Sequence, residues 1–327
     1  MPTSFANIGV VVIGRNEGQR LIDCLASLKI DMRKVVYVDS GSTDGSVAAA
    51  AKFGVTVIKL DLSQPFTPGR ARNEGVVALK AIGQIEFVQF VDGDCELAPG
   101  WLAAALAFIA ERPDVAVACG RRRERFPERS VYNRLCDIEW DSPIGDTLAC
   151  GGDSLMRLKA FDEVGGFNLR LIAGEEPELC ARLRQRGWKI WRLDAEMTRH
   201  DAAMTQFGQW WRRAVRSGYG YAEGSTLAAQ SNIWGKAEIR AIFWGGLLPL
   251  VIIVGALVYT GMLWLVLVYP LQICQIALRR EAANGESWSY ALFVTLAKFA
   301  EFRGVVKFYW RHWLGQKMEL IEYKRPG

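Results

Sequence analysis

Histidine is scarce in this chain of 327 residues, which contains only His200 and His312. The seven cysteines form no Cys-x-x-Cys pair. Because structural zinc sites gather Cys and His ligands at short spacing, this scarcity argues against a zinc cluster. The odd number of cysteines, together with the lack of a cleavable signal sequence, predicts free thiols in a reducing cytoplasm.

Charge is the second absence, because Lys, Arg, Asp and Glu are all missing from residues 241–278. A helix of about 20 apolar residues spans a bilayer, so this stretch predicts two transmembrane helices with a hairpin tip near Gly261. Positive charge at both ends predicts a hairpin that returns to the cytoplasm. The flanking basic residues are Lys236, Arg240, Arg279 and Arg280.

The sequence therefore divides into a cytoplasmic domain, 1–235, and a membrane region, 236–327. Residues 288–314 mix aromatic and basic side chains, which predicts an amphipathic helix lying in the membrane interface. The alternative is a buried amphipathic helix of the soluble domain. A net charge of +5 without a basic arm argues against nucleic acid and favours a cytoplasmic membrane surface as neighbour. The run 121–125 is interpreted either as a solvated or lipid-facing loop or as a phosphate contact.

The first 92 residues alternate between two hydrophobic patterns. Short β-branched runs predict buried strands, and longer segments with helical spacing or Ala-rich composition predict helices. The order predicts an α/β fold with an open, mainly parallel sheet and helices on both faces. Strands are expected at 8–13, 35–38, 55–60 and 87–91, and helices at 17–28, from about 44 to 53 and at 70–82.

Polar residues follow three of these strands. Arg15, Asn16 and Glu17 follow the first, Asp39 ends the second, and Asp92-Gly93-Asp94 follows the fourth. Ligands of such sheets bind at the carboxyl ends of the strands, where helix N-termini offer N–H groups to phosphate. Two carboxylates two residues apart suit a hard cation shared with a diphosphate, so the sequence predicts Mg²⁺ or Mn²⁺ there.

Six segments together resemble glycosyltransferase family 2, the inverting enzymes of GT-A fold. No segment is specific alone, but they stand in the family's order and span about 180 residues. They are VVIGRNEG (11–18), VYVDSGSTDGS (36–46), PGRARNEG (68–75), VDGDCEL (91–97), GGDSLMRLKAFDEVGGF (151–167) and GEEPELCARLRQRGWKI (174–190).

The resemblance implies a donor site for a nucleotide-diphosphate sugar, with UDP favoured. Asp39 would contact the nucleotide base, although an Asx turn is the alternative for this residue. Asp44 would help hold that pocket, and Asp92 and Asp94 would bind the ribose and the metal-bound diphosphate. Further donor contacts are expected from Arg15, Glu17, Arg70 and Arg72, the last two because a guanidinium can grip a phosphate with two N–H donors.

The resemblance also implies a base that takes the proton of the acceptor hydroxyl. Glu176 aligns with the family's catalytic Asp, and the departure is a side chain longer by one methylene that precedes Pro177. The alternative is that Glu175, Glu176 and Glu178 only stabilise the positive end of a helix. Asp153 is expected near the acceptor hydroxyl and is the next candidate for the base.

Acceptor contacts are expected from Arg157 and from Gln209-Trp210-Trp211-Arg212-Arg213. The latter nearly reproduces the Gln-x-x-Arg-Trp signature of processive glycan synthases, but Arg213 replaces the final Trp, which favours transfer of one sugar. Trp210 and Trp211 suit sugar stacking or an interfacial anchor equally well. His200, after a predicted strand at 190–193 and a loop, would complete the metal shell. The alternative is a plain surface histidine or one that only contacts a metal ligand.

The sequence as a whole predicts an inverting glycosyltransferase of the cytoplasmic membrane, with its catalytic domain in the cytoplasm. The acceptor would be a lipid-linked or membrane-proximal glycan. Direct attack by the acceptor needs no covalent enzyme intermediate, so the lack of a Ser-His-Asp set is expected. The alternatives are a nucleotidyltransferase and a non-catalytic membrane scaffold that binds a nucleotide.

Overall fold

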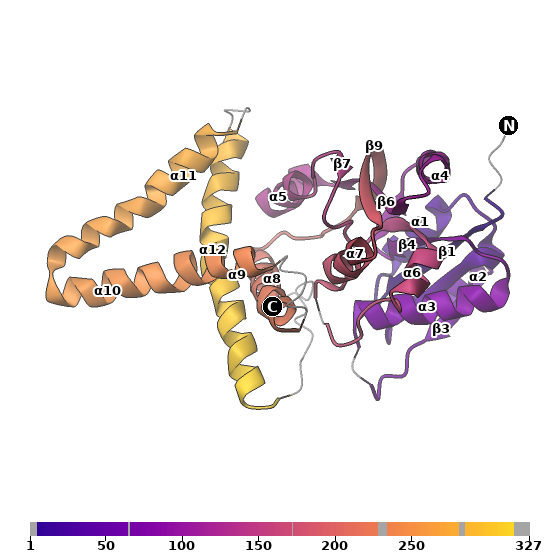
Figure 1. Cartoon of the computed structure of the whole chain (residues 1–327), viewed down its shortest axis with the longest axis horizontal. Coiled ribbons are helices and arrows are strands. Elements are labelled where there is room, and N and C mark those ends of the chain that lie inside the picture. Colours follow the sequence, from indigo (N-terminus) through magenta and orange to yellow (C-terminus); the bar gives the residue numbers. More distant parts are fainter. Residues whose placement is uncertain (1–4, 65, 172, 228–233, 281–284, 317–327) are drawn as a thin grey trace. The chain divides into compact units, whose positions relative to one another are not determined.

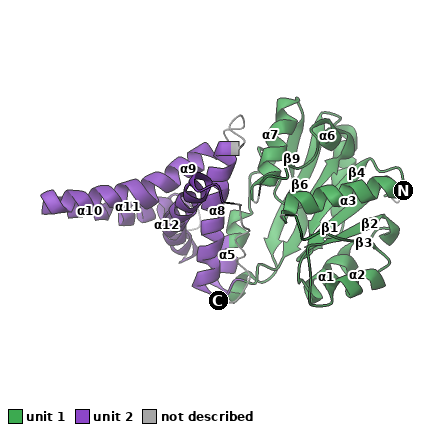
Figure 2. Ribbon diagram, turned by 90° about the horizontal axis from the view of Figure 1, so that it is seen from below, with its two compact units in different colours: residues 1–129, 136–203 green, residues 130–135, 204–327 purple. Residues whose placement is uncertain are grey.

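The computed structural model describes residues 5–64, 66–171, 173–227, 234–280 and 285–316. The chain forms two compact units, coloured separately in Figure 2. Unit 1 contains residues 1–129 and 136–203, and unit 2 contains residues 130–135 and 204–327. Residues 204–227 and 234–235 group with the C-terminal helices in this division, and the domain boundary at 235 stays a prediction.

Unit 1 is built on a sheet that has nine strands in the described part of the chain. Eight follow the order β3-β2-β1-β4-β8-β6-β9-β5, and β7 pairs with β9 outside this order. The four strands predicted from the sequence are confirmed, and they pair in parallel around β1. They are β1 (Ile8–Gly14), β2 (Val35–Asp39), β3 (Thr56–Lys59) and β4 (Phe87–Asp92).

The second half of the sheet is mixed. Strand β8 (Ser154–Arg157) runs antiparallel to both β4 and β6 (Val115–Glu124), and β9 (Lys189–His200) runs parallel to β6. Strands β5 (Cys95–Leu97) and β7 (Gly145–Asp146) are antiparallel to β9. The loop expected at 121–125 is instead largely the end of β6, and β9 continues as strand to His200.

Helices cover both faces of the sheet, as predicted (Figure 1). Successive β1 residues face opposite cores: Val10 and Val12 pack in one hydrophobic cluster, and Val11 and Ile13 pack in the other. Full burial of each such side chain contributes about 1.5–3 kcal/mol. One face carries α1 (Gln19–Ser27), α2 (Ser46–Lys52) and α4 (Trp101–Glu111); the other carries α3 (Pro68–Ile82), α6 (Leu158–Glu163) and α7 (Glu175–Gln185).

Unit 2 contains two long apolar helical segments, Gly235–Val258 and Thr260–Leu278, with mean hydropathies of 2.4 and 1.7. Both are long enough to cross a membrane, and few of their side chains are buried. The break at Tyr259 lies close to the expected hairpin tip. In Figure 1, α10 (Leu248–Val258) and α11 (Val268–Leu278) diverge from this turn.

Residues 285–313 form one helix, α12 (Gly285–Trp313), which packs against α8 (Phe207–Leu227). Two glycines permit the close crossing: a Cβ on Gly218 would lie 1.9 Å from the carbonyl oxygen of Glu301, and one on Gly304 would lie 2.1 Å from that of Val215. One face of α12 is therefore packed against α8 within unit 2. Its location in a membrane interface stays a prediction.

Candidate active site

Sheet register brings the predicted strand-end residues together. Asp39 pairs with Gly14, and Asp92 pairs with Ile13, so both aspartates flank the carboxyl end of β1. Since all three strands are parallel, the loops that follow them meet at one edge. The position of this predicted site follows from the βα order alone.

The loop after β1 is tied to the loop after β2. The Asn16 side-chain oxygen accepts the amide of Thr43 at 2.7 Å, and the Asn16 amide donates to Ser42 Oγ at 2.9 Å. Asn16 has φ 56°, a left-handed conformation that asparagine tolerates better than most residues. These contacts fix the loop that carries Arg15 and Glu17, and Glu17 also pairs with Arg20 at 2.8 Å.

Asp39 is buried and forms the Asx turn that the sequence left open. One carboxylate oxygen accepts the amides of Gly41 and Ser42, each at 3.0 Å, and the other accepts the Tyr37 hydroxyl at 3.1 Å. Burial raises the pKa of Tyr37, so its phenol keeps the proton that it donates. The contact with a nucleotide base stays a prediction for this carboxylate.

Asp44 organises the start of α2. Its Oδ1 accepts the Ser46 amide at 3.0 Å and the Ser46 hydroxyl at 2.6 Å. Burial acts to raise the pKa of Asp44, but these hydrogen bonds outweigh it and hold the pKa below the ordinary value. The Ser46 hydroxyl in turn accepts the amide of Gly18, which links α2 to the first loop.

Arg70 and Arg72 lie near the start of α3 but make different contacts. Arg70 donates to the carbonyl oxygens of Asp61 at 2.8 Å and Gln64 at 3.4 Å, so it holds the loop after β3. The amide of Arg70 is capped by the Thr67 hydroxyl at 3.1 Å. The guanidinium of Arg70 thus binds backbone carbonyl oxygens, and its contact with the donor stays a prediction.

Arg72 links the donor-side carboxylate to the helix that carries the predicted base. Its buried guanidinium donates to Asp92 at 2.8 Å and to Glu175 at 2.8 Å, and lies 3.8 Å from Glu176. Burial acts to lower the pKa of Arg72, but the charges of these carboxylates outweigh it and raise the pKa. The guanidinium also lies 5.5 Å from the centre of the Phe167 ring. Arg72 thus fixes the distance between two parts of the site.

The three acids of the α7 first turn have separate environments. Glu175 is paired with Arg72, and Glu178 pairs with Arg182 at 2.6 Å. The Glu176 side chain is 18% exposed, so solvent and small molecules reach it. Burial, and then the charge of Glu175, raises the pKa of Glu176 to about 7. A general base works best when its pKa lies near the working pH, so Glu176 is the acid suited to that role.

Asp153 is fully buried, which does not support the catalytic and acceptor-side role predicted for it. Its carboxylate accepts the Asp92 amide at 2.9 Å and the Thr198 hydroxyl at 2.7 Å, and pairs with Arg122 at 2.7 Å. With 0% exposure, no acceptor hydroxyl can reach it. Burial acts to raise the pKa of Asp153, but Arg122 and Thr198 outweigh it and lower the pKa. Asp153 is therefore a positioning residue.

Arg122 is a site residue that the sequence reasoning did not single out. It lies in β6 beside Thr198 of β9, and its guanidinium reaches Asp153 and lies 3.5 Å from Asp92. Arg121 and Arg123 on either side instead pair with Asp137. Alternation along a strand sends only the middle arginine of the run to this site. If the run 121–124 is treated as a strand, this alternation already separates Arg122 from Arg121 and Arg123 in the sequence.

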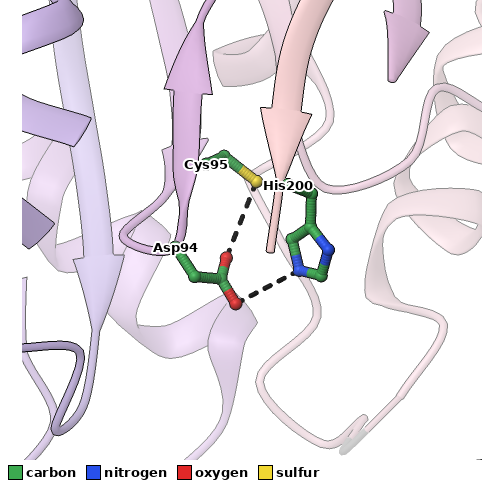
Figure 3. A group of neighbouring side chains, drawn as sticks. All are labelled: Asp94, Cys95 and His200. Atoms are coloured by element: carbon green, nitrogen blue, oxygen red, sulfur yellow. Dashed lines mark hydrogen bonds and ion pairs between the residues drawn. The ribbon is translucent and has the colours of Figure 1, made fainter. Parts of the chain in front are cut away.

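A possible cation site lies at the ends of β5 and β9 (Figure 3). A carboxylate oxygen of Asp94, a His200 ring nitrogen and the Cys95 sulfur all lie within 4.8 Å of one another. His200 Nε2 is 3.1 Å from Asp94 Oδ2, and its ring packs edge-on against Trp140 with centroids 4.8 Å apart. His200 is thus a buried partner of Asp94 rather than a plain surface residue.

The donor types in this cluster fit a divalent cation of the Mn²⁺ or Mg²⁺ kind. Asp94 supplies oxygen, the ligand that both ions prefer, and a neutral His200 supplies one nitrogen. Burial, and then the charge of Asp153, raises the pKa of the Cys95 thiol well above its ordinary value. A protonated thiol is a poor ligand for hard cations, so Cys95 stays outside the ligand set.

The structure does not bring Arg157 to this site. Arg157 pairs with Phe87 at the start of β4, whereas Asp92 ends that strand. Its guanidinium donates to the carbonyl oxygens of Ile109 and Val115 and lies over the Phe87 ring. Because β8 runs antiparallel to β4, a residue at the end of β8 lies at the opposite edge of the sheet from the site. Arg157 therefore lies apart from the candidate site residues, and its acceptor role stays a prediction.

The aromatic acceptor candidates belong to unit 2. Trp210 is buried in α8, with its ring 5.0 Å from that of Phe293 and 6.4 Å from that of Tyr132. Trp211 is half-buried beside Trp210, at 6.3 Å between ring centres. The Trp210 ring therefore packs among aromatic side chains. The acceptor contacts of Trp211 and Arg212 stay predictions.

Residues 9–165 match the family model described as glycosyl transferase family 2. This segment, which contains Asp39, Asp92, Asp94 and Asp153, belongs to glycosyl transferase family 2, and the resemblance noted in the sequence is confirmed. The match ends before α7 and His200, so it does not include the base candidate.

Two curated relatives carry transferase names. O-antigen chain rhamnosyltransferase RfbN of Salmonella typhimurium is 24% identical over 195 residues, which cover 55% of this chain and 60% of the relative. Pre-mycofactocin glycosyltransferase of Mycobacterium tuberculosis is 26% identical over 225 residues, covering 63% of this chain and 45% of the relative. The chain thus spans about half the length of the curated relatives it matches.

A solved structure similar to this chain is the mannosyltransferase PcManGT from Pyrobaculum calidifontis, in complex with GDP-Man and Mn²⁺. The TM-score is 0.57 at 17% identity, and the match covers 93% of this chain and 87% of that one. Together with the family match, this likeness shows that the sheet domain has the GT-A fold that the sequence predicted.

Proposed function

We propose that this protein is a metal-dependent, inverting glycosyltransferase that moves a sugar from a nucleotide-diphosphate donor to a hydroxyl of a lipid-linked or membrane-proximal glycan. The family match and the names of the relatives support sugar transfer. The observation that carries the proposal is the Arg72 bridge, which holds Asp92 of the strand-end cluster and Glu175 of α7 at 2.8 Å each. It keeps Glu176 beside the donor-side carboxylates.

Each step of the proposed reaction is assigned to particular residues. Glu176, with a pKa of about 7, takes the proton of the acceptor hydroxyl as its oxygen attacks the anomeric carbon. The bond from that carbon to the nucleoside diphosphate breaks in the same step, so the configuration inverts. Asp94 and His200 would hold the cation, which when bound neutralises charge on the departing diphosphate. Arg72 and Arg122 hold Asp92 in place throughout.

Metal binding at Asp94 finds support in a likeness of fold. The PcManGT structure holds GDP-Man and Mn²⁺ on this fold. The carboxylate and imidazole pair of this chain would serve the same purpose, with Asp92 as the neighbouring carboxylate. The sequence predicted UDP as the donor nucleotide. An assay with a panel of UDP-sugars and GDP-sugars distinguishes UDP from GDP.

We also propose that the two apolar helical segments cross the cytoplasmic membrane as a hairpin with unit 1 in the cytoplasm, where nucleotide sugars are made. The support is their length, high mean hydropathy and low burial. Basic residues at both flanks favour a cytoplasmic location for both ends. An acceptor held in or near the bilayer would suit an enzyme with such an anchor.

The test is a donor panel on the full chain purified in detergent. The protein is incubated with UDP-sugars and GDP-sugars, Mn²⁺ and a membrane-lipid extract, and the released nucleotide is measured. Release of nucleoside diphosphate that depends on Mn²⁺ supports the proposal. Release of pyrophosphate from a nucleoside triphosphate and a sugar phosphate supports the nucleotidyltransferase instead. Nucleotide binding without either reaction supports the non-catalytic membrane scaffold.

A further inference from the structure

Two thiols that the proposed reaction does not use lie in contact beside the site. The Sγ atoms of Cys150 and Cys180 are 3.6 Å apart. Cys150 is half-buried in the segment before β8, where its thiol also donates to the Gly151 carbonyl oxygen at 3.3 Å. Cys180 is fully buried on α7. The two cysteines are 30 positions apart in the sequence and meet only through the fold.

This contact is close to bonding geometry. A disulfide has its sulfurs about 2.05 Å apart, so a relative shift of about 1.5 Å joins them. An oxidant can reach the half-buried Cys150, and the buried Cys180 supplies the second thiol. The other cysteines of unit 1 are buried.

We propose that Cys150 and Cys180 form a reversible intramolecular disulfide when the protein meets a disulfide oxidant such as oxidised glutathione. The Cys150 thiolate attacks one sulfur of the oxidant and releases one glutathione thiolate. Cys180 then loses its proton and attacks the Cys150 sulfur, which releases the second glutathione. Two protein thiols are oxidised and one glutathione disulfide is reduced to two thiols.

The order of these steps follows from the environments of the two sulfurs. The hydrogen bond with Cys150, and then burial, raises the pKa of the Cys180 thiol well above its ordinary value. Little thiolate therefore forms at Cys180, and the half-buried Cys150 is the sulfur that reacts first. In a reducing cytoplasm the pair stays a dithiol, and the bond forms when the thiol pool is oxidised.

The bond would connect both halves of the site, a consequence that rests on the proposed function. Cys180 lies one helical turn beyond Glu176 on α7, and Cys150 lies three residues before Asp153, which holds the Asp92 amide. Closing the sulfurs by about 1.5 Å pulls α7 toward that segment. Misplacement of a catalytic group by about 1 Å can cost about 10²-fold in rate, so the oxidised protein should turn over donor at least about tenfold more slowly.

Peptide mapping tests the bond without any need for turnover. The full chain in detergent is incubated with oxidised glutathione, alkylated with N-ethylmaleimide, digested and analysed by mass spectrometry. We expect a linked pair of peptides that contain Cys150 and Cys180, lost after dithiothreitol. The pair should persist in Cys274→Ser, which removes another half-buried thiol, and vanish in Cys150→Ser. Glutathione attached to Cys150 alone, or alkylation of both thiols after oxidation, overturns the proposal.

Turnover measured on the same samples tests the effect on the site. Reduced wild-type protein is compared with oxidised protein before and after dithiothreitol, and Cys150→Ser should be indifferent to the oxidant. A linked protein that turns over donor at the reduced rate overturns the predicted displacement of α7. Lack of turnover in the reduced protein counts against the proposed function instead, and the peptide map still decides whether the bond forms.

Discussion

Replacement of Glu176 by Gln should lower activity and raise stability above pH 7, because the same burial that tunes the carboxylate also makes its charge costly. The pKa of Glu176 is raised from 4.5 to about 7, first by burial and then by Glu175. Each pKa unit corresponds to about 1.4 kcal/mol, so the ionised carboxylate costs the folded state up to about 3 kcal/mol. Gln fits the same space without a charge.

The sign follows from proton binding. Between pH 4.5 and about 7, the folded protein keeps the Glu176 proton while the unfolded chain has released it. This stabilising contribution is complete below pH 4.5 and is lost as the pH rises through about 7. Glu176→Gln should therefore match the wild type near pH 4.5 and exceed it at pH 8. At about 2–4 °C per kcal/mol, the gain in Tm at pH 8 is on the order of 5–10 °C.

Tryptophan fluorescence during thermal unfolding, measured from pH 4.5 to 8 on the full chain in detergent, gives the Tm difference. Glu178→Gln is the matched control on the same helical turn, and it should lower the Tm because Arg182 loses its partner. Nucleotide release should fall about 10²–10⁴-fold in Glu176→Gln, and the wild-type rate should rise with pH to a plateau above about 7. A Tm gain that does not grow with pH, or transfer at the wild-type rate, would refute the reasoning.

Changes at three other places in the chain give definite expectations. Arg72→Ala removes the ion pair of the buried Glu175 and leaves Asp92 with Arg122 alone, so it should cost about 3–5 kcal/mol of unfolding free energy, measured by urea titration. Arg72→Lys should fold better yet still lose turnover. Asp94→Ala should abolish Mn²⁺-dependent donor turnover, and His200→Ala should raise the Mn²⁺ concentration for half-maximal rate at least about tenfold; unchanged metal titrations would remove both from the cation site. Deletion of residues 235–278 should release the protein from the membrane fraction, and retention after carbonate washing would argue for another anchor.

Local patterns explain why the parallel half of the sheet was predictable. β-branched runs buried on both faces, such as Val10 to Ile13, have few other stable placements in a soluble domain. A βα order then fixes the strand ends that meet, so Asp39 and Asp92 were expected together. The two apolar segments of unit 2 were equally visible, because a long uncharged run is a local property of the chain.

The second half of the sheet was not predictable in the same way. The strand nature of 121–125 was hidden because a run of arginines has none of the alternation typical of a half-buried strand. Its partners, β8 and β9, lie far away in the sequence, and only pairing with them sends Arg122 to the site. The same pairing shows that Arg157 ends an antiparallel strand at the opposite edge.

The sequence by itself determined the class of fold, the edge of the sheet where the candidate site lies, the family resemblance of residues 9–165 and the two apolar helices, since each follows from short-range patterns or motifs. Only the tertiary structure decided the surroundings of each side chain. Burial separated Asp153, which positions Asp92, from Glu176, which remains accessible, and long-range packing brought Arg72 to two carboxylates and Cys150 to Cys180. Such contacts depend on register and helix placement, which no local pattern specifies.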